Sequence, residues 1–384
     1  MIDWISESRW RMPAILIAYF SVHVFVRCAI SPSLDYDESE QVFLSQCLSY
    51  GYNSQPPLYT WVQTGIFEIF GYSVFSLAAF KNLLLCGTYL LVFATVRKAT
   101  DHIGLAVIAA IGLLTIPQIA WESHRDLSHT VAVTLATALA FYSVVSLAKD
   151  GRSRWYWLLG VAAALGMLSK YNFAIVIVAM IIAGFSVRSY RRFLLDWRMA
   201  IAVAIAAAMI LPHAVWMRGH LELISSKTLT TMTTNQSNDW LQDVRAGFTA
   251  FSVSTLSCCA ITVATFVPFV WRRRYANLTI TPATDEDGQA TMLLIERFLI
   301  GTAVVLCVLI LSGSALEFKN RWLQPFVVML PAYLVLRLGS IARADRCGMH
   351  RICAMAVVLR ISILTATISR PLVSRYRDKY CWLN

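Results

Sequence analysis

The chain has 384 residues, of which 58% are hydrophobic and only 14% are charged. A water-soluble domain cannot bury that much apolar surface, whereas about 20 apolar residues suffice for one membrane-spanning helix, so the composition predicts an all-α polytopic membrane protein. The formal net charge is +11, but the basic residues lie in short clusters between apolar runs, as they do in cytoplasmic loops. We therefore expect no nucleic-acid partner.

Apolar runs in chain order predict about eleven transmembrane helices. The first run lacks a small-residue cleavage site and is longer than a signal-peptide core, so we interpret it as a retained span. The predicted spans are residues 12–30, 73–96, 103–121, 127–148, 155–169, 172–187, 199–217, 248–271, 292–313, 322–340 and 350–369.

The basic clusters between these runs predict how the chain crosses the membrane. Clusters such as Arg97-Lys98, Arg191-Arg192 and residues 272–274 fall on the side of the N-terminus, which indicates N-inside and, with eleven spans, C-outside. We expect residues 1–384 to form a single transmembrane domain. Within it we expect a first outer loop at 31–72, an outer loop at 218–247, a cytoplasmic linker at 275–290, and a short outer tail at 370–384 with no soluble C-terminal domain.

The first outer loop holds an unusual concentration of acids. Residues 28–80 contain no Lys or Arg, so these acids have no local ion-pair partner, and we expect them to find one in water, on a metal or on a substrate. The spacing of apolar residues predicts two interfacial amphipathic helices, the first capped by Asp35 or Asp37 and the second starting after Pro57. The four acids are Asp35, Asp37, Glu38 and Glu40.

The other polar clusters fall on the same side of the predicted membrane. They follow the third, fifth, seventh and ninth spans and are separated from one another only by apolar runs and by short basic loops on the opposite side. Together with the first outer loop they give five outer segments, which we expect to converge on one face. The four later clusters are residues 122–126, 169–172, 213–243 and 317–322.

The spacing of these motifs resembles that of the polyprenyl-phosphate-dependent GT-C membrane glycosyltransferases of the family 39 type. This is the superfamily of the dolichyl-phosphate-mannose protein mannosyltransferases and the bacterial aminoarabinose and galacturonic-acid transferases of lipid A. Many relatives carry a soluble domain after the last span, and the predicted tail of this chain departs from that pattern. The motifs that carry the resemblance are Asp37-Glu38, Gly51-Tyr52, residues 55–61, Lys81, His124-Arg125-Asp126, Lys170-Tyr171-Asn172 and residues 319–322.

The resemblance implies a GT-C fold and a specific reaction. A sugar would move, with inversion, from polyprenyl phosphate to a hydroxyl of an envelope acceptor, which is lipid A, a glycan or a protein. The reaction would take place on the periplasmic face of the bacterial cytoplasmic (inner) membrane, whose lipids are the other expected partners. Polyprenyl phosphate is already a good leaving group, so the enzyme needs a base for the hydroxyl and cations for the departing phosphate.

The resemblance also assigns roles to residues. We expect Asp37 to be the base, with Glu38 and Asp126 as the other catalytic acids. No cofactor is certain, and a divalent metal held with the help of Asp126 remains open. The expected phosphate ligands are Lys81, Arg125, Lys170, Lys319 and Arg321, and the expected substrate-binding residues are Gln55, Pro56, Tyr59, His124, Tyr171 and Asn172.

Other interpretations fit parts of this pattern. A transporter or flippase of a lipid-linked or anionic solute would also have many spans, but such proteins usually show paired repeats and polar groups at mid-membrane, and the sequence shows no repeat. A non-catalytic subunit or lipid-binding scaffold is the third alternative. At the level of residues, Asp126 and Arg125 could form a structural ion pair, and Lys81 could extend along the apolar surface to reach water.

Overall fold

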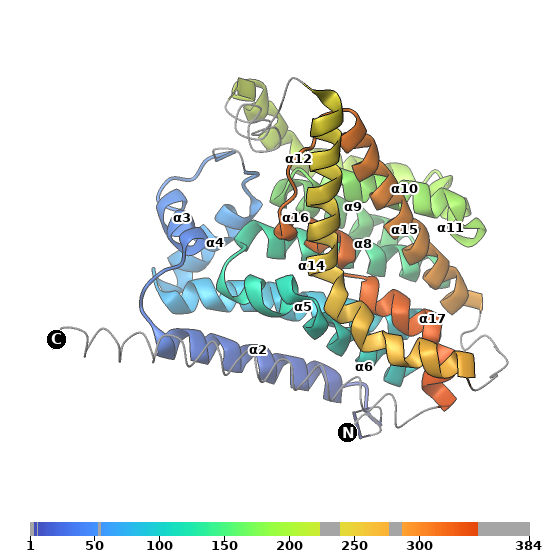
Figure 1. Ribbon diagram of the computed structural model, residues 1–384. Helices are drawn as coiled ribbons and strands as arrows, with labels where there is room; N and C mark the ends of the chain where they lie inside the picture. Colours follow the sequence, from blue (N-terminus) through green and yellow to red (C-terminus); the bar gives the residue numbers. More distant parts are fainter. Residues whose placement is uncertain (1–3, 6, 53–54, 223–238, 276–285, 345–384) are drawn as a thin grey trace, which may run out of the picture.

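The structure is a computed structural model, and it describes residues 4–5, 7–52, 55–222, 239–275 and 286–344. These residues form helices and their connections, with one isolated β-bridge between Tyr52 and Gln55. Figure 1 shows the helices arranged as one bundle. The protein is therefore all-helical over the part of the chain that is described.

The N-terminal part of the chain, residues 11–150, contains both long and short helices. They are α2 (Arg11–Ile30), α3 (Tyr36–Leu44), α4 (Leu58–Phe70), α5 (Val74–Thr100), α6 (Ile103–Gly112), the 3₁₀ turn η1 (Leu113–Thr115), the π turn η2 (Gln118–Glu122), α7 (Ser123–Arg125) and α8 (Ser128–Asp150).

The second half surrounds α8 and extends the bundle. Its helices are α9 (Arg154–Ser169), α10 (Phe173–Ser186), α11 (Arg188–Leu194), α12 (Met199–Arg218), α14 (Trp240–Tyr275), α15 (Glu286–Leu311), α16 (Asn320–Val327) and α17 (Leu330–Ala344).

Six of the described helices are long and apolar enough to cross a membrane, and the number is up to eight if each of two bent helix pairs counts as one span. The six are α2, α5, α8, α12, residues 240–267 of α14, and α15. The chain is an all-helical membrane protein with six to eight candidate spans. Of the remaining segments expected to span, 155–169 forms the 16-residue helix α9, 322–340 is divided between α16 and α17, and 350–369 lies outside the described residues.

The core of the bundle forms around α5 and α8. Helix α5 packs against α2, α6 and α8, and α8 packs against α9. Buried apolar side chains such as Val92, Phe141 and Phe298 belong to one continuous cluster. Close packing of this kind holds helices together in lipid, where apolar burial alone gives little drive. Helices α9 and α12 approach so closely that a Cβ on Gly160 would lie 2.5 Å from the Ala202 carbonyl oxygen, so this position requires glycine.

The segment expected to form a single span at 103–121 is broken. Ile116 is extended, with ψ of 108°, because a residue before proline is disfavoured in the helical region and Pro117 cannot donate a backbone hydrogen bond. The two parts, residues 103–115 and 118–125, are bent by 78°. The break carries residues 123–126 to the end of the bundle where α3 and α4 lie.

Two loops expected from the sequence are partly helical. Residues 240–247 of the expected outer loop belong to α14, and residues 286–290 of the expected linker form the start of α15, where Glu286 and Asp287 suit the positive end of the helix dipole. The rest of that linker from 276, residues 223–238 of the outer loop, and the expected tail at 370–384 lie outside the described residues. The segment expected at 172–187 ends in a 118° bend from α10 into α11.

Two helices form in the first outer loop, as the sequence predicted. Asp35 is the N-cap of α3, and the Glu38 side chain reaches back to the cap backbone in a capping box, which satisfies amides left free at a helix start. Helix α4 begins directly after Pro57. Both helices lie at one end of α2 and α5, and α11 lies at the opposite end of the bundle (Figure 1).

Candidate active site

Two carboxylates from distant parts of the chain meet beside α3. The backbone N–H of Asp37 donates to Asp126 Oδ1 at 3.2 Å, and the backbone N–H of Ser128 donates to Asp37 Oδ2 at 3.1 Å. Both side chains are half-buried. Burial and the neighbouring Asp37 charge raise the pKa of Asp126 above that of an ordinary aspartate, because two close carboxylates resist ionising together.

The backbone between Asp126 and Ser128 is strained. Leu127 has a φ of +73°, a conformation that a bulky residue seldom adopts and that tends to occur at functional sites. Its side chain is buried, which anchors the residue in place. This turn joins α7 to α8 and aims the Ser128 amide at Asp37.

Glu38 lies in a buried ion cluster beside this pair. Its Oε2 is 2.5 Å from Arg27 Nη2, and its Oε1 is 3.6 Å from Lys81 Nζ. Both Glu38 and Lys81 are 1% exposed. The expectation that the acids lack protein partners is therefore wrong for Glu38, because its partners lie on α2 and α5, immediately outside the segment without basic residues.

Lys81 holds a second segment of the site in place. Its Nζ donates to the backbone carbonyl of Arg125 at 3.3 Å. The alternative that Lys81 extends to the surface is wrong, since the side chain is buried. The cluster thus joins α2, α3, α5 and the residues before Asp126 into one unit.

Four other cations that the sequence singled out lie outside this cluster. Among the described residues, no carboxylate lies within ion-pair distance of Arg125, Lys170, Lys319 or Arg321. The suggested ion pair between Arg125 and Asp126 is thus absent. Arg125 and Lys319 are exposed, and Arg321 is half-exposed.

Lys170 is the cation most affected by its surroundings. Its Nζ donates to Thr130 Oγ1 at 2.9 Å. Burial and the positive charge of Arg321 lower the pKa of Lys170 to about 7, while the Asp37 charge opposes that shift. Arg321 and Asp37 therefore both lie within electrostatic range of Lys170, and a bound anion would favour the charged form of Lys170.

Two predicted substrate-binding residues follow Lys170 and connect the site to other helices. The Tyr171 hydroxyl lies 3.0 Å from His213 Nε2 on α12. Asn172 Nδ2 donates to the Trp322 carbonyl oxygen at 3.2 Å, and Asn172 Oδ1 is buried without a hydrogen-bond partner among the described residues. An unsatisfied buried acceptor is costly unless a ligand supplies a donor.

The other predicted substrate-binding residues lie in packed surroundings. His124 stacks on the ring of His23 with a centroid separation of 4.0 Å. Tyr59 is buried against Phe80. Pro56 is buried, and Gln55 is half-buried. Tyr59 and Pro56 are thus buried, whereas His124 and Gln55 are half-buried.

Gly51, in the loop between α3 and α4, fits against α12. A Cβ on Gly51 would lie 2.2 Å from the Trp216 ring, so the loop can approach α12 only with glycine here. His213 Nδ1 lies 2.7 Å from the Tyr50 carbonyl oxygen, and the same ring reaches Tyr171 through its other nitrogen. His213 therefore links the first outer loop to the segment that carries Lys170.

A buried polar cluster behind Asp37 was not predicted from the sequence. Gln41 Oε1 accepts a hydrogen bond from Thr60 Oγ1 at 2.9 Å, and Gln41 Nε2 lies 3.2 Å from His129 Nε2. All three residues are buried. The available signal was spacing, because Gln41 is four residues after Asp37 and so lies on the same face of α3. Arg27 was missed because it lies inside the first apolar run.

A metal site is not evident in this arrangement. Among the residues described, no three or more His, Cys, Asp and Glu side chains are grouped so that they could hold a metal ion. The carboxylates that meet here are Asp37 and Asp126, and Glu38 already pairs with Arg27 and Lys81. We therefore assign no step of the chemistry to a metal.

Comparison with known proteins identifies the family. Residues 54–216 match the family described as dolichyl-phosphate-mannose-protein mannosyltransferase. The chain is 36% identical over 371 residues to the lipopolysaccharide core galacturonosyltransferase RgtB of Rhizobium johnstonii, a match that covers 97% of this chain and 74% of RgtB. The chain belongs to the dolichyl-phosphate-mannose-protein mannosyltransferase family.

A second relative supports the same assignment. The lipopolysaccharide core galacturonosyltransferase RgtA of Rhizobium johnstonii is 32% identical over 352 residues, covering 92% of this chain and 69% of RgtA. As a member of this family, the chain is a membrane glycosyltransferase that uses a lipid-linked sugar donor. The function predicted from the motifs is thus confirmed, and the transporter and scaffold alternatives are set aside.

Solved structures show the same fold. ArnT from Cupriavidus metallidurans bound to undecaprenyl phosphate matches with a TM-score of 0.60 at 13% identity, covering 96% of this chain and 73% of ArnT. ArnT in the apo state matches with a TM-score of 0.59 at 14% identity, covering 90% and 62%. The family member described here therefore has an ArnT-like fold.

Proposed function

We propose that the protein transfers a galacturonosyl residue from a polyprenyl phosphate to a hydroxyl of the lipopolysaccharide core. The sugar and the acceptor are suggested by the activity in the names of RgtB and RgtA, and the carrier by the undecaprenyl phosphate bound to ArnT. The observation that carries the reaction is the Asp37–Asp126 pair with unpaired cations close by.

Asp37 is the general base of the proposed reaction. The Ser128 amide holds its Oδ2, so the carboxylate is oriented before the acceptor arrives. Asp37 takes the proton of the acceptor hydroxyl as the oxygen forms a bond to the anomeric carbon of the sugar. The bond from that carbon to the phosphate oxygen breaks, polyprenyl phosphate leaves with the electron pair, and the configuration inverts.

Asp126 positions this base. It accepts a hydrogen bond from the Asp37 backbone N–H, and its raised pKa keeps it protonated to a higher pH than an ordinary aspartate. We assign the base to Asp37 because the Ser128 amide orients its Oδ2, and we assign Asp126 to holding the Asp37 backbone in place.

The cations Arg125, Lys170 and Arg321 stabilise the leaving phosphate, with Lys319 at the edge of the site. A guanidinium can grip two phosphate oxygens at once, which makes Arg321 a suitable ligand. Lys170 becomes more firmly protonated when the phosphate arrives, since the added negative charge raises its pKa from about 7.

Lys81 and Glu38 act differently from the roles suggested by the resemblance. Both are buried, and Glu38 is shared by two cations, Lys81 and Arg27, so it balances one of their two positive charges. We assign them to positioning: Glu38 fixes the start of α3 next to Asp37, and Lys81 holds the Arg125 carbonyl. Neither needs to touch the substrate in this proposal.

A negatively charged sugar suits the cations of the site. Arg125, Lys170, Lys319 and Arg321 have no carboxylate at ion-pair distance among the described residues. The carboxylate of a galacturonosyl group would give them a second anionic group to bind besides the phosphodiester. The unsatisfied Asn172 Oδ1 would accept a hydrogen bond from a sugar hydroxyl, and we assign Tyr171 and Gln55 to substrate binding as well.

The proposed orientation places this site on the periplasmic side of the inner membrane. Its support is the clustering of basic residues at the other end of the helices. N-inside and C-outside remain the proposed topology.

The Asp37→Asn variant tests the role of the base. With purified full-length enzyme, polyprenyl-phosphate galacturonic acid and lipopolysaccharide core, we expect its turnover to fall by about a hundredfold to ten-thousandfold. The affinity for undecaprenyl phosphate should stay within about twofold, because the cations remain in place. Asp101→Asn, an exposed aspartate at the far end of α5, is the matched control and should leave turnover unchanged.

Retention of turnover by Asp37→Asn would contradict the assignment of the base. The sugar and acceptor are tested separately, by mass spectrometry of lipopolysaccharide core from cells with and without the gene. Loss of a hexuronic acid from the core, restored only by wild type, supports the proposed transfer. Loss of a different sugar, or a change in another envelope component, would overturn that part.

A further inference from the structure

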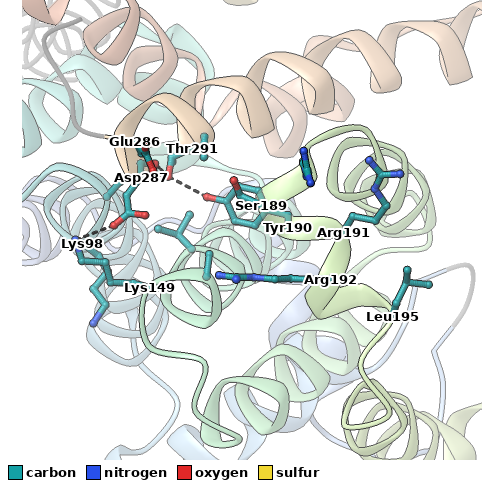
Figure 2. A pocket seen from close by; sticks show the side chains of 15 residues that line it. Lys98, Lys149, Ser189, Tyr190, Arg191, Arg192, Leu195, Glu286, Asp287 and Thr291 are labelled. Carbon is teal, nitrogen blue, oxygen red and sulfur yellow. Dashed lines mark hydrogen bonds and ion pairs between the residues drawn. The ribbon is translucent and has the colours of Figure 1, made fainter.

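A second, basic cavity lies at the end of the bundle opposite the candidate active site. It has a volume of about 840 Å³ and is lined by residues of α5, α8, α11 and α15. Figure 2 shows side chains from these helices around the hollow, with Lys98 and Lys149 on one wall and Arg191 and Arg192 on another. Nothing in the proposed reaction uses this cavity.

Helix lengths place the cavity far from the chemistry. Lys81 and Lys98 lie on the same helix, α5, and are separated by about 26 Å along its axis; Ser128 and Lys149 on α8 are separated by about 32 Å. The hydrocarbon core of a bilayer is about 30 Å thick. In the proposed orientation these separations match the distance between the two interfaces of a bilayer, with the active site at one and the basic cavity at the other.

One wall of the cavity is already neutralised. Lys98 Nζ is 2.9 Å from Asp150 Oδ2, and Lys149 Nζ lies 3.2 Å from Asp101 and 3.0 Å from Asp287. The floor is closed by a hydrogen bond of 3.0 Å between the hydroxyls of Tyr190 and Thr291. This wall is a fixed structure that joins α5, α8 and α15.

The other wall carries free positive charge. Arg188, Arg191 and Arg192 are exposed on α11, and within the described ranges none of them has a carboxylate at ion-pair distance. Arg192 contacts the face of the Phe193 ring. Three guanidiniums without a carboxylate partner thus line the cavity from one short helix, and the planar guanidinium group suits phosphate oxygens.

The position of α11 indicates that the anion belongs to a lipid. This helix is bent by 118° from α10, so it crosses the end of the bundle instead of continuing through it. The large apolar side chains next to it, Leu195 and Trp197, are 68% and 78% exposed, as expected for residues that rest in the bilayer interface. Basic pockets between membrane helices are typical sites for anionic headgroups.

We propose that this cavity binds the phosphate headgroup of an anionic membrane lipid from the leaflet opposite the active site. The three arginines of α11 bind the phosphate, and the apolar residues beside α11 contact the acyl chains. The volume fits a headgroup with its glycerol, since ligand sites of about 300 to 1,000 Å³ hold molecules of that size. The bound lipid would fix α11 against α5, α8 and α15.

Native mass spectrometry of the full-length protein in detergent tests the proposal with three probes: dioctanoyl phosphatidylglycerol, dioctanoyl phosphatidylcholine and inorganic phosphate. We expect phosphatidylglycerol to bind at least about tenfold more tightly than phosphatidylcholine. Arg188→Gln/Arg192→Gln should weaken phosphatidylglycerol binding by about tenfold or more. Arg152→Gln, an exposed arginine outside the cavity at the same end, should leave it unchanged.

The outcomes separate the alternatives. Equal phosphatidylglycerol affinity in wild type and the double variant would overturn the site, and equal affinity for the two lipids would overturn the headgroup selectivity. Inorganic phosphate that binds as tightly as phosphatidylglycerol and displaces it would show a soluble anion as the ligand. Thermal melting is measured to check that the double variant folds. The single variant Arg192→Gln should lose about half as much binding free energy and gives a second, milder measurement.

Discussion

At the scale of single residues, the site depends on a few side chains placed by an unusual backbone. Leu127 adopts a positive φ, and on either side of it stand the Asp126 carboxylate and the Ser128 amide that contact Asp37. A leucine in this conformation costs on the order of 1–3 kcal/mol. The surrounding packing holds it, because the leucine side chain is buried.

We expect Asp126→Asn to lower turnover without lowering the melting temperature at pH 8. The raised pKa of Asp126 means that the folded state binds this proton more tightly than the unfolded chain does. The wild type therefore loses stability as the pH rises from about 3.9, the unfolded value, through the raised folded value. Asparagine cannot ionise, so at pH 8 the variant should melt at the same temperature as the wild type or higher.

Turnover should nevertheless fall, by up to about a hundredfold, because the orientation of Asp37 is disturbed. Melting curves at pH 4 and pH 8 and turnover assays with the purified enzyme measure these effects. A variant that melts well below wild type at pH 8 would contradict the raised pKa.

At the scale of elements, the Glu38 cluster explains how three helices are fixed around the site. Arg27 lies in the last turn of α2, Glu38 in the first turn of α3 and Lys81 in the first part of α5. Glu38 is the carboxylate that both cations share in a buried place, where an unpaired charge would be expensive. The cluster therefore sets the position of α3, and through it that of Asp37.

Glu38→Gln should destabilise the protein strongly. Removing one partner of a buried ion pair leaves an uncompensated charge, which typically costs about 3–5 kcal/mol. Thermal melting in detergent measures the loss. The double variant Glu38→Gln/Lys81→Met removes the more deeply buried of the two stranded cations, Arg27 being the other, and should recover part of the stability.

If Glu38 instead contacts the substrate, Glu38→Gln would melt like wild type while turnover collapses. That result would return Glu38 to the catalytic acids that the resemblance suggested. A double variant no more stable than the single one would show that Lys81 does not depend on Glu38 for its charge balance.

At the scale of the whole molecule, two sites of different chemistry occupy the two ends of one bundle. The end with α3 and α4 combines carboxylates and cations, whereas the end with α11 is basic. The long helices α5 and α8 connect them and form the packed centre. Figure 1 shows α3 and α11 on opposite sides of that centre.

The proposed orientation predicts which end reacts from outside. Cys47 follows α3 and is exposed at the active-site end, and Ser153 is exposed at the other end. In an otherwise cysteine-free background, a membrane-impermeant maleimide should label Cys47 in intact spheroplasts. It should label Ser153→Cys only after the membrane is permeabilised. The reverse pattern would place the active site in the cytoplasm and contradict the topology.

The sequence alone determined the class of protein, the motifs and most of the reaction. Apolar runs indicate helices because a membrane span must make its backbone hydrogen bonds within itself. The spacing of the Asp37, Lys170 and Arg321 motifs can be read from the sequence without a structure. The helix boundaries at the first outer loop follow from a capping residue and a proline pair, which are local signals.

Which of these residues work together depends on how the helices pack in three dimensions. Asp37 and Asp126 are 89 residues apart, and no local rule brings them into contact. Glu38 looked like a free acid because its partners lie across the bundle on α2 and α5, and the basic cavity draws its walls from four separate helices. Periodicity determines which face of a helix a residue lies on, but the partner on that face depends on how the helices pack.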